Sequence, residues 1–144
     1  MSFRVEKKYR LSYGDSFKIK SNLIKLGMKK LYPDSQINSE YLDTKKLNMF
    51  SDSEEGVLPR KKIRIRWYSD KSNQNLETKI SSVEGRYKKS ERFFTLDRNQ
   101  NFYLYDEFYG KIYSTIIVSY NREYYNFKNL RITFDTNIKY INSR

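Results

Sequence analysis

The chain has 144 residues, a formal net charge of +12, and neither cysteine nor histidine. The missing residue types exclude disulfide scaffolds, thiol nucleophiles, Cys/His zinc sites and any mechanism that needs an imidazole base. The length predicts a single domain, and the positive charge predicts an anionic partner such as nucleic acid, acidic lipid or a phosphorylated molecule.

The N-terminal third is predicted to form a strand, a helix and a second strand. Residues 3–11 alternate with the period of a strand. Residues 15–26 carry an apolar stripe of helical spacing, and Gly27 is expected to end this helix. Pro33 should break the chain before the second strand, which is expected over residues 36–42.

The central segment, residues 60–68, alternates cations with apolar residues. In a strand, Lys62, Arg64 and Arg66 would share one face, and the opposite face would carry Ile63, Ile65 and Trp67. Three like charges on one strand face repel one another unless an anion lies in front of them. This segment therefore predicts a phosphate-binding surface, although a solvated sheet face is the simpler explanation for each cation alone.

The remaining elements are predicted to be mostly strands. Before the basic strand, the polar residues 44–55 should form a short helix or a loop, and after it a turn at residues 69–73 should lead into a hairpin partner. Residues 97–110 are expected to be irregular or weakly helical, with aromatic side chains that pack. Strands are expected over residues 75–81, 86–96, 113–125 and 129–138. This order predicts an α+β, mainly β fold: an antiparallel sheet that curls into a barrel or tunnel, with one or two packing helices.

Cations recur on several of these strand faces. If the faces turn inward together, the candidate set is Lys8, Lys62, Arg64, Arg66, Lys79, Lys88, Arg92, Arg122 and Arg131. Such an interior must stay hydrated, hold an anion, or be balanced by acidic side chains, because uncompensated buried cations cost several kcal/mol each. Glu6, Glu77 and Asp135 could supply that balance or bind metal, and Tyr120 is interpreted as packing.

Six ordered motifs resemble the VTC domain, the polyphosphate polymerase branch of the CYTH-like triphosphate tunnel metalloenzymes. The resemblance extends from about residue 3 to residue 135. The motifs are EKKY at 6–9, INSEYLDT at 37–44, KIRIRWY at 62–68, LETK at 76–79, YNR at 120–122 and RITFD at 131–135.

The resemblance implies an antiparallel β-barrel tunnel whose basic walls bind triphosphate or polyphosphate together with a divalent metal, Mg²⁺ or Mn²⁺. The side chains expected to act on the reacting phosphates are Arg64, Arg66, Lys79, Arg122 and Arg131. Further phosphate contacts are expected from Lys8, Lys62, Lys88 and Arg92, and metal binding from Glu6 and Glu77.

The sequence also departs from the pattern expected of VTC domains. It ends soon after Asp135, without the usual final strand that carries a glutamate and a lysine. The segment between Arg92 and Tyr120 is also short. We expect one domain over residues 1–144. Three explanations of the short form stay open: a minimal barrel closes differently, a second subunit completes it, or the protein binds polyphosphate without efficient turnover.

The expected reaction is transfer of the γ-phosphate of ATP to a growing polyphosphate chain. A phosphate oxygen is already ionised at neutral pH, so the protein needs neither a nucleophile nor a strong base. Two alternatives stay open: metal-dependent hydrolysis of triphosphate or polyphosphate, and a non-catalytic module that binds nucleic acid or another polyanion. No apolar run approaches the ~20 residues of a membrane-spanning helix, so we expect a cytoplasmic protein without a membrane span.

Overall fold

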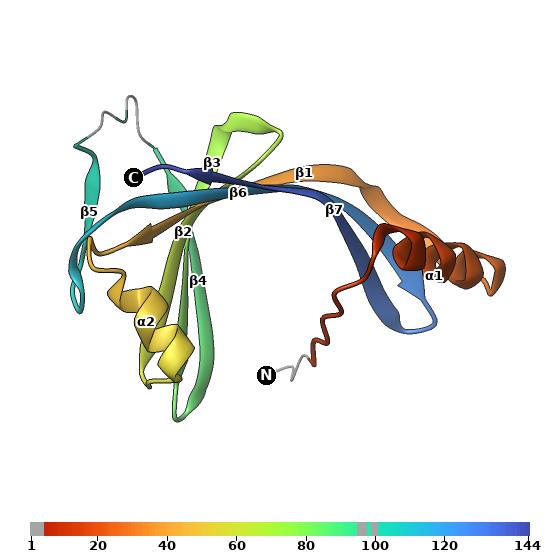
Figure 1. The fold of residues 1–144 in the computed structure, drawn as a ribbon, viewed down its shortest axis with the longest axis horizontal. Coiled ribbons are helices and arrows are strands. Elements are labelled where there is room, and N and C mark those ends of the chain that lie inside the picture. The colour runs from red at the N-terminus through yellow and green to blue at the C-terminus, as the bar shows by residue number, and fades with distance from the viewer. Residues whose placement is uncertain (1–4, 95–97, 99–100) are drawn as a thin grey trace. The chain divides into compact units, whose positions relative to one another are not determined.

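The computed structural model describes residues 5–94, 98 and 101–144 (Figure 1). The described chain is mainly β, with seven strands and two helices, which confirms the predicted fold class. The helices are α1 (Tyr13–Lys25) and α2 (Asn48–Glu55). The strands are β1 (Lys29–Asp43), β2 (Arg60–Tyr68), β3 (Asp70–Ser82), β4 (Gly85–Phe93), β5 (Tyr103–Asp106), β6 (Gly110–Phe127) and β7 (Leu130–Asn142).

The strands form one antiparallel sheet in the order β4-β3-β2-β1-β6-β5, with β7 paired to β6. Within the described residues this sheet is not closed. Its closure into a tunnel therefore stays a prediction.

The chain divides into two compact units, and each is considered by itself. The first comprises residues up to 34 together with residues 123–134, and the second comprises residues 35–122 and 135–144. The longest strands run through both units. The expectation of one domain over residues 1–144 is not tested by this division.

Helix α1 and a small apolar cluster organise the first unit. The Ser12 hydroxyl caps the helix by accepting a hydrogen bond from the Asp15 backbone N–H at 3.1 Å. Gly27 ends it in a left-handed conformation, with φ of 106°. Leu23 packs against a core of Met28, Tyr125 and Phe134. The predicted helix is thus confirmed, displaced by one or two residues at its ends.

The main core lies in the second unit. Ile63, Ile65 and Trp67 of β2 are buried together with residues from β1, α2 and β6. This confirms the predicted apolar face of the basic strand. Asp43 fixes the start of α2, because its carboxylate accepts hydrogen bonds from the backbone N–H groups of Met49 and Phe50.

The predicted first strand is wrong for the residues that the structure describes. Residues 5–12 have no regular secondary structure, and residues 3 and 4 lie outside the described chain. Val5 and Tyr9 are largely exposed. The alternation in this segment therefore buries no apolar face, and the burial that would stabilise a strand is absent.

Three other boundaries also differ from the expectations. β1 continues through Pro33, because the fixed φ of proline is compatible with an extended backbone. The turn expected at residues 69–73 is tighter, since β3 already begins at Asp70 beside a register shift at Tyr68. Within residues 97–110, of which 97, 99 and 100 lie outside the described chain, the structure forms β5. Of the strand expected over residues 86–96, residues 95 and 96 lie outside it too.

Neither helix of the described chain is long and apolar enough to cross a membrane.

Candidate phosphate-binding site

Three lysines lie side by side across neighbouring strands of the second unit. Lys62 of β2 is directly opposite Lys79 of β3, and Lys79 is directly opposite Lys88 of β4. All three side chains therefore point to the same face of the sheet, which we call the basic face. Like charges directly opposite one another destabilise a sheet. This lysine row is expected to favour the binding of an anion in front of the basic face.

An ion-pair network occupies the next positions along the same strands. Arg64 is opposite Tyr41 on one side and Glu77 on the other. Its Nε and Nη2 atoms lie 2.8 and 2.6 Å from Oε2 of Glu77, and its Nη1 donates to the Tyr41 hydroxyl at 3.2 Å. Oε1 of Glu77 lies 3.2 Å from Nζ of Lys88. The network joins four strands, β1 to β4, and carries a net charge of about +1.

Burial and charge act in opposite directions on the two central groups of this network. Burial lowers the pKa of Arg64, but Tyr41 and Glu77 more than compensate, and the net shift is upward. Burial raises the pKa of Glu77, and the hydrogen bond and positive charge of Arg64, helped by Arg66 and Lys88, reverse it to a net decrease. Both groups are therefore charged at neutral pH.

Arg66 differs from Arg64 because its partners are neutral. The residue is only 9% exposed. Nε donates to the Ser39 hydroxyl at 3.1 Å, and Nη2 makes a longer contact of 3.4 Å with the Tyr120 hydroxyl. Within the described residues, no carboxylate forms an ion pair with it. Arg66 is thus a buried guanidinium whose charge is not balanced by a direct contact.

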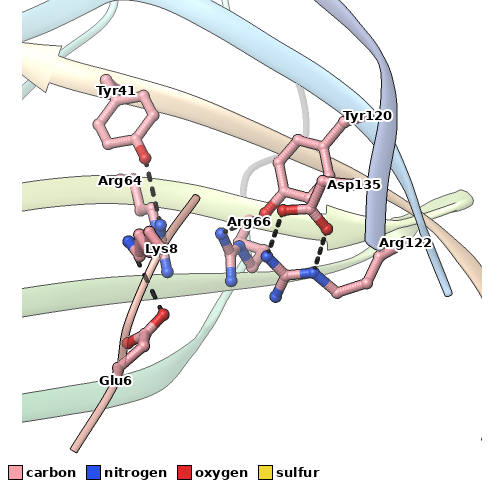
Figure 2. A network of polar contacts seen from close by, with 8 residues as sticks. All are labelled: Glu6, Lys8, Tyr41, Arg64, Arg66, Tyr120, Arg122 and Asp135. Carbon is pink, nitrogen blue, oxygen red and sulfur yellow. Dashed lines mark hydrogen bonds and ion pairs between the residues drawn. The ribbon is translucent and has the colours of Figure 1, made fainter. Parts of the chain in front are cut away.

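Strand β6 brings Arg122 to the same neighbourhood (Figure 2). Arg122 forms a two-pronged pair with Asp135, with distances of 2.6 and 2.8 Å, and its guanidinium lies 5.2 Å from the ring centre of Tyr120. Burial raises the pKa of Tyr120, and the charges of Arg66, Arg122 and Arg64 oppose that increase. The three arginines therefore act electrostatically on a single hydroxyl, as expected if they converge.

The remaining candidate residues make contacts outside the network of Arg64, Glu77 and Lys88. Arg92 is opposite Asn75 on the basic face and hydrogen-bonds the side chain of Asn73. In the first unit, Arg131 lies over the rings of Tyr32 and Tyr124, at 5.8 and 5.4 Å. Also in the first unit, Lys8 and Glu6 form an exposed pair at 3.8 Å. The roles expected for these residues stay predictions.

The contacts of the described carboxylates bear on the expected metal site. Within the described part of the chain, no group of three or more acidic side chains is placed to hold a metal ion. Glu77 has a cation at each of its two oxygens, and Glu6 belongs to the first unit. The expected metal-binding roles of Glu6 and Glu77 therefore stay predictions.

Three hydroxyl groups of the site were not predicted as functional. Ser39, Tyr41 and Tyr120 hold the guanidinium groups of Arg64 and Arg66. Ser39 and Tyr41 lie in one of the motifs, but their alignment with the arginines depends on the antiparallel register of β1 and β2. Tyr120 was interpreted as packing, and nothing in its local sequence indicates a contact with a residue 54 positions away.

The family model of the VTC domain matches residues 3–144. The chain belongs to the VTC domain family. This match confirms the resemblance drawn from the six motifs. No match was found among curated proteins. Membership of the VTC family suggests a polyphosphate-related role for this domain.

The lowered pKa of Glu77 predicts that the stability of this VTC domain depends on pH in the acidic range. Because the folded pKa lies below the ordinary value of 4.5, the ionised carboxylate stabilises the fold above pH 4.5. That contribution is lost as the pH falls through the folded pKa. We expect urea unfolding at pH 7, 5, 4 and 3 to show a smaller loss of stability for Glu77→Gln than for the wild type. Equal pH slopes for the two proteins would contradict the assignment.

Proposed function

We propose that this VTC domain binds the phosphate chain of inorganic triphosphate or polyphosphate on its basic face and transfers the γ-phosphate of ATP to the end of a polyphosphate chain. The observation that carries the proposal is the buried guanidinium of Arg66, which is held only by neutral hydroxyls. A buried charge without a counter-ion costs several kcal/mol, and a bound phosphate oxygen would offset that cost.

The neighbouring cations support a chain-like anion over a compact one. The lysine row lies two residues along β2 and β3 from the Arg64–Glu77 pair, and Arg66 lies two residues further along β2. Successive residues in a strand are about 3.3 Å apart, so Lys62 and Arg66 start from positions about 13 Å apart. A linear polyanion can contact cations at both positions, whereas a single phosphate group can contact one of them.

The proposed transfer requires little chemistry from the protein. An ionised terminal oxygen of polyphosphate attacks the γ-phosphorus of ATP, and the bond from that phosphorus to the β–γ bridging oxygen breaks. ADP leaves with the electron pair, and the polyphosphate is longer by one phosphate. The guanidinium groups would bind the equatorial phosphate oxygens and hold the two chains in line. No general base is needed, which suits a chain without histidine or cysteine.

The contacts of Glu77 favour transfer over hydrolysis. A hydrolase must activate water, usually with a base or a metal. Glu77 is the acidic side chain nearest Arg64 on the basic face, and cations already occupy both of its oxygens. Arg64 and Lys88 lower its basicity further, because they decrease its pKa.

The products formed from ATP test this proposal. We expect a ladder of phosphate polymers on a polyacrylamide gel when the protein is incubated with ATP, a short polyphosphate primer and Mn²⁺ or Mg²⁺. Release of orthophosphate without a ladder would identify a hydrolase. Binding of tripolyphosphate in calorimetry without either product would reduce the function to binding, and absence of binding would overturn the proposal as a whole.

A further inference from the structure

Glu77 lies within the basic face, and the proposed function leaves it without a role. We propose that Glu77 is a positioning residue: it fixes the direction of the Arg64 guanidinium and thereby makes the site prefer phosphate chains to other polyanions. This inference rests on the proposed function, because it concerns the selectivity of the same site.

Glu77 and the Tyr41 hydroxyl together hold the Arg64 guanidinium, and we call these contacts the clamp. Oε2 of Glu77 accepts from both Nε and Nη2 of Arg64, at 2.8 and 2.6 Å, which engages one whole edge of the guanidinium. The Tyr41 hydroxyl contacts Nη1 at 3.2 Å. A guanidinium held at one edge and at a further nitrogen cannot rotate freely. The side chain is therefore already ordered in the unbound protein. Ligand binding then costs little further conformational entropy for Arg64.

The other oxygen of Glu77 restrains Lys88. Its Oε1 lies 3.2 Å from the Lys88 ammonium, and the two cations would otherwise repel each other across the same carboxylate. Water screens the pair of Arg64 and Glu77 weakly, because these side chains are 13% and 7% exposed, and it screens the half-exposed Lys88 more strongly. One carboxylate on β3 therefore contacts cations from both flanking strands, Arg64 on β2 and Lys88 on β4.

Positioning and charge predict opposite effects when Glu77 is neutralised. Removing the negative charge raises the net charge of the face by one, which strengthens its attraction for any polyanion. Removing the clamp releases Arg64, which weakens the binding of a ligand that needs its guanidinium in one direction. Two ligands of different geometry can therefore separate the two effects.

The test uses Glu77→Gln and Glu77→Asp, with tripolyphosphate and a single-stranded thymidine oligonucleotide as probes. Glutamine keeps the length of the side chain and removes the charge. Aspartate keeps the charge and is shorter by one methylene group, so it does not reach Arg64 in the same way. Affinities are measured by calorimetry at 0.15 M salt, and circular dichroism monitors the fold.

We expect Glu77→Gln to weaken tripolyphosphate binding by roughly tenfold and to tighten oligonucleotide binding by roughly twofold or more. Glu77→Asp should weaken tripolyphosphate by a similar factor and leave the oligonucleotide affinity unchanged. The matched control is Asp106→Asn. Asp106 is another buried carboxylate, paired with Lys61 at 2.9 Å, and Lys61 points away from the basic face. This control should leave the ratio of the two affinities unchanged.

Several results would overturn the inference. Tighter binding of both probes by Glu77→Gln would mean that Glu77 acts only through its charge. An unchanged ratio in both variants, with reduced stability, would mean that its role is structural. If the wild type binds no tripolyphosphate, the proposed function itself is wrong. That outcome differs from the two above, in which the wild type binds and only the role of Glu77 is overturned.

A measurement on the wild type keeps the inference testable if the variants do not fold. The nitrogen and proton resonances of Arg64 Nε–H report its hydrogen bond to Glu77. We expect this proton to stay protected from exchange when tripolyphosphate is added, because the clamp persists in the complex. Loss of protection on binding would show that Arg64 leaves Glu77 for the ligand, and would overturn the positioning role.

Discussion

Replacing Arg66 with methionine is expected to weaken tripolyphosphate binding by about 100-fold. Loss of a buried charged partner typically costs 2–5 kcal/mol of binding free energy, and the lower half of that range corresponds to this factor. Methionine keeps most of the volume of the arginine stem and removes the guanidinium. The measurement is calorimetric titration with tripolyphosphate at 0.15 M salt.

The fold should tolerate this substitution. The partners of Arg66 are the hydroxyls of Ser39 and Tyr120, and no carboxylate loses an ion pair. We expect a change of about 1 kcal/mol or less in the free energy of unfolding, because removal of a buried charge offsets the loss of its two hydrogen bonds. Lys89→Met is the matched control: it also removes one cation, but Lys89 is exposed and adjoins Lys88 on β4, so it points to the opposite face. A similar loss of affinity in both variants would show that net charge, and not Arg66, determines binding.

Replacing Arg64 with methionine is expected to destabilise the protein by about 2 kcal/mol. Removal of one member of a buried ion pair typically costs 3–5 kcal/mol, and here Lys88 stays beside Glu77 as a second partner, which reduces the cost. Arg64 is only 13% exposed and is paired with Glu77, so its removal is expected to affect the fold as well as ligand binding.

A double-mutant cycle tests this energetic link. Adding Glu77→Gln to Arg64→Met removes the carboxylate that lost its partner, so we expect the double variant to recover about 1 kcal/mol relative to the sum of the single changes. Urea unfolding at pH 7 gives all four free energies.

Arg122→Met is the control. Its pair with Asp135 has a similar two-pronged geometry, but the side chains of Arg122 and Asp135 are 26% and 33% exposed. That variant should lose less than about 1 kcal/mol. Additive effects at Arg64 and Glu77 would contradict the coupling.

These two arginines, two residues apart on β2, thus have different expected roles. Arg64 forms an ion pair with Glu77, so its removal should mainly lower the free energy of unfolding. Arg66 contacts only neutral hydroxyls in the described residues, so its removal should mainly lower the affinity for the phosphate chain. The distinction depends on which side chains the neighbouring strands β1 and β3 place opposite each arginine.

Strand β2 could be predicted from the sequence to the residue, because strict alternation of cations with isoleucine and tryptophan specifies both its period and its buried face. The same alternation failed for residues 5–12, where Val5 and Tyr9 are largely exposed. Pattern alone indicates a strand only where a core lies beside it. Proline was also a poor guide, since β1 accommodates Pro33 in an extended backbone.

The amino-acid sequence by itself determined the mainly β class, the basic face of β2, the family and the absence of imidazole and thiol chemistry, because each of these follows from residue type and short-range period. Only the tertiary structure decided how those charges are used. Strand register places Lys62 opposite Lys79, and Lys79 opposite Lys88. It also places Arg64 opposite Glu77. Arg66 contacts two hydroxyls instead. Register is set by the packing of distant segments, and a one-residue shift would turn every one of these side chains to the other face.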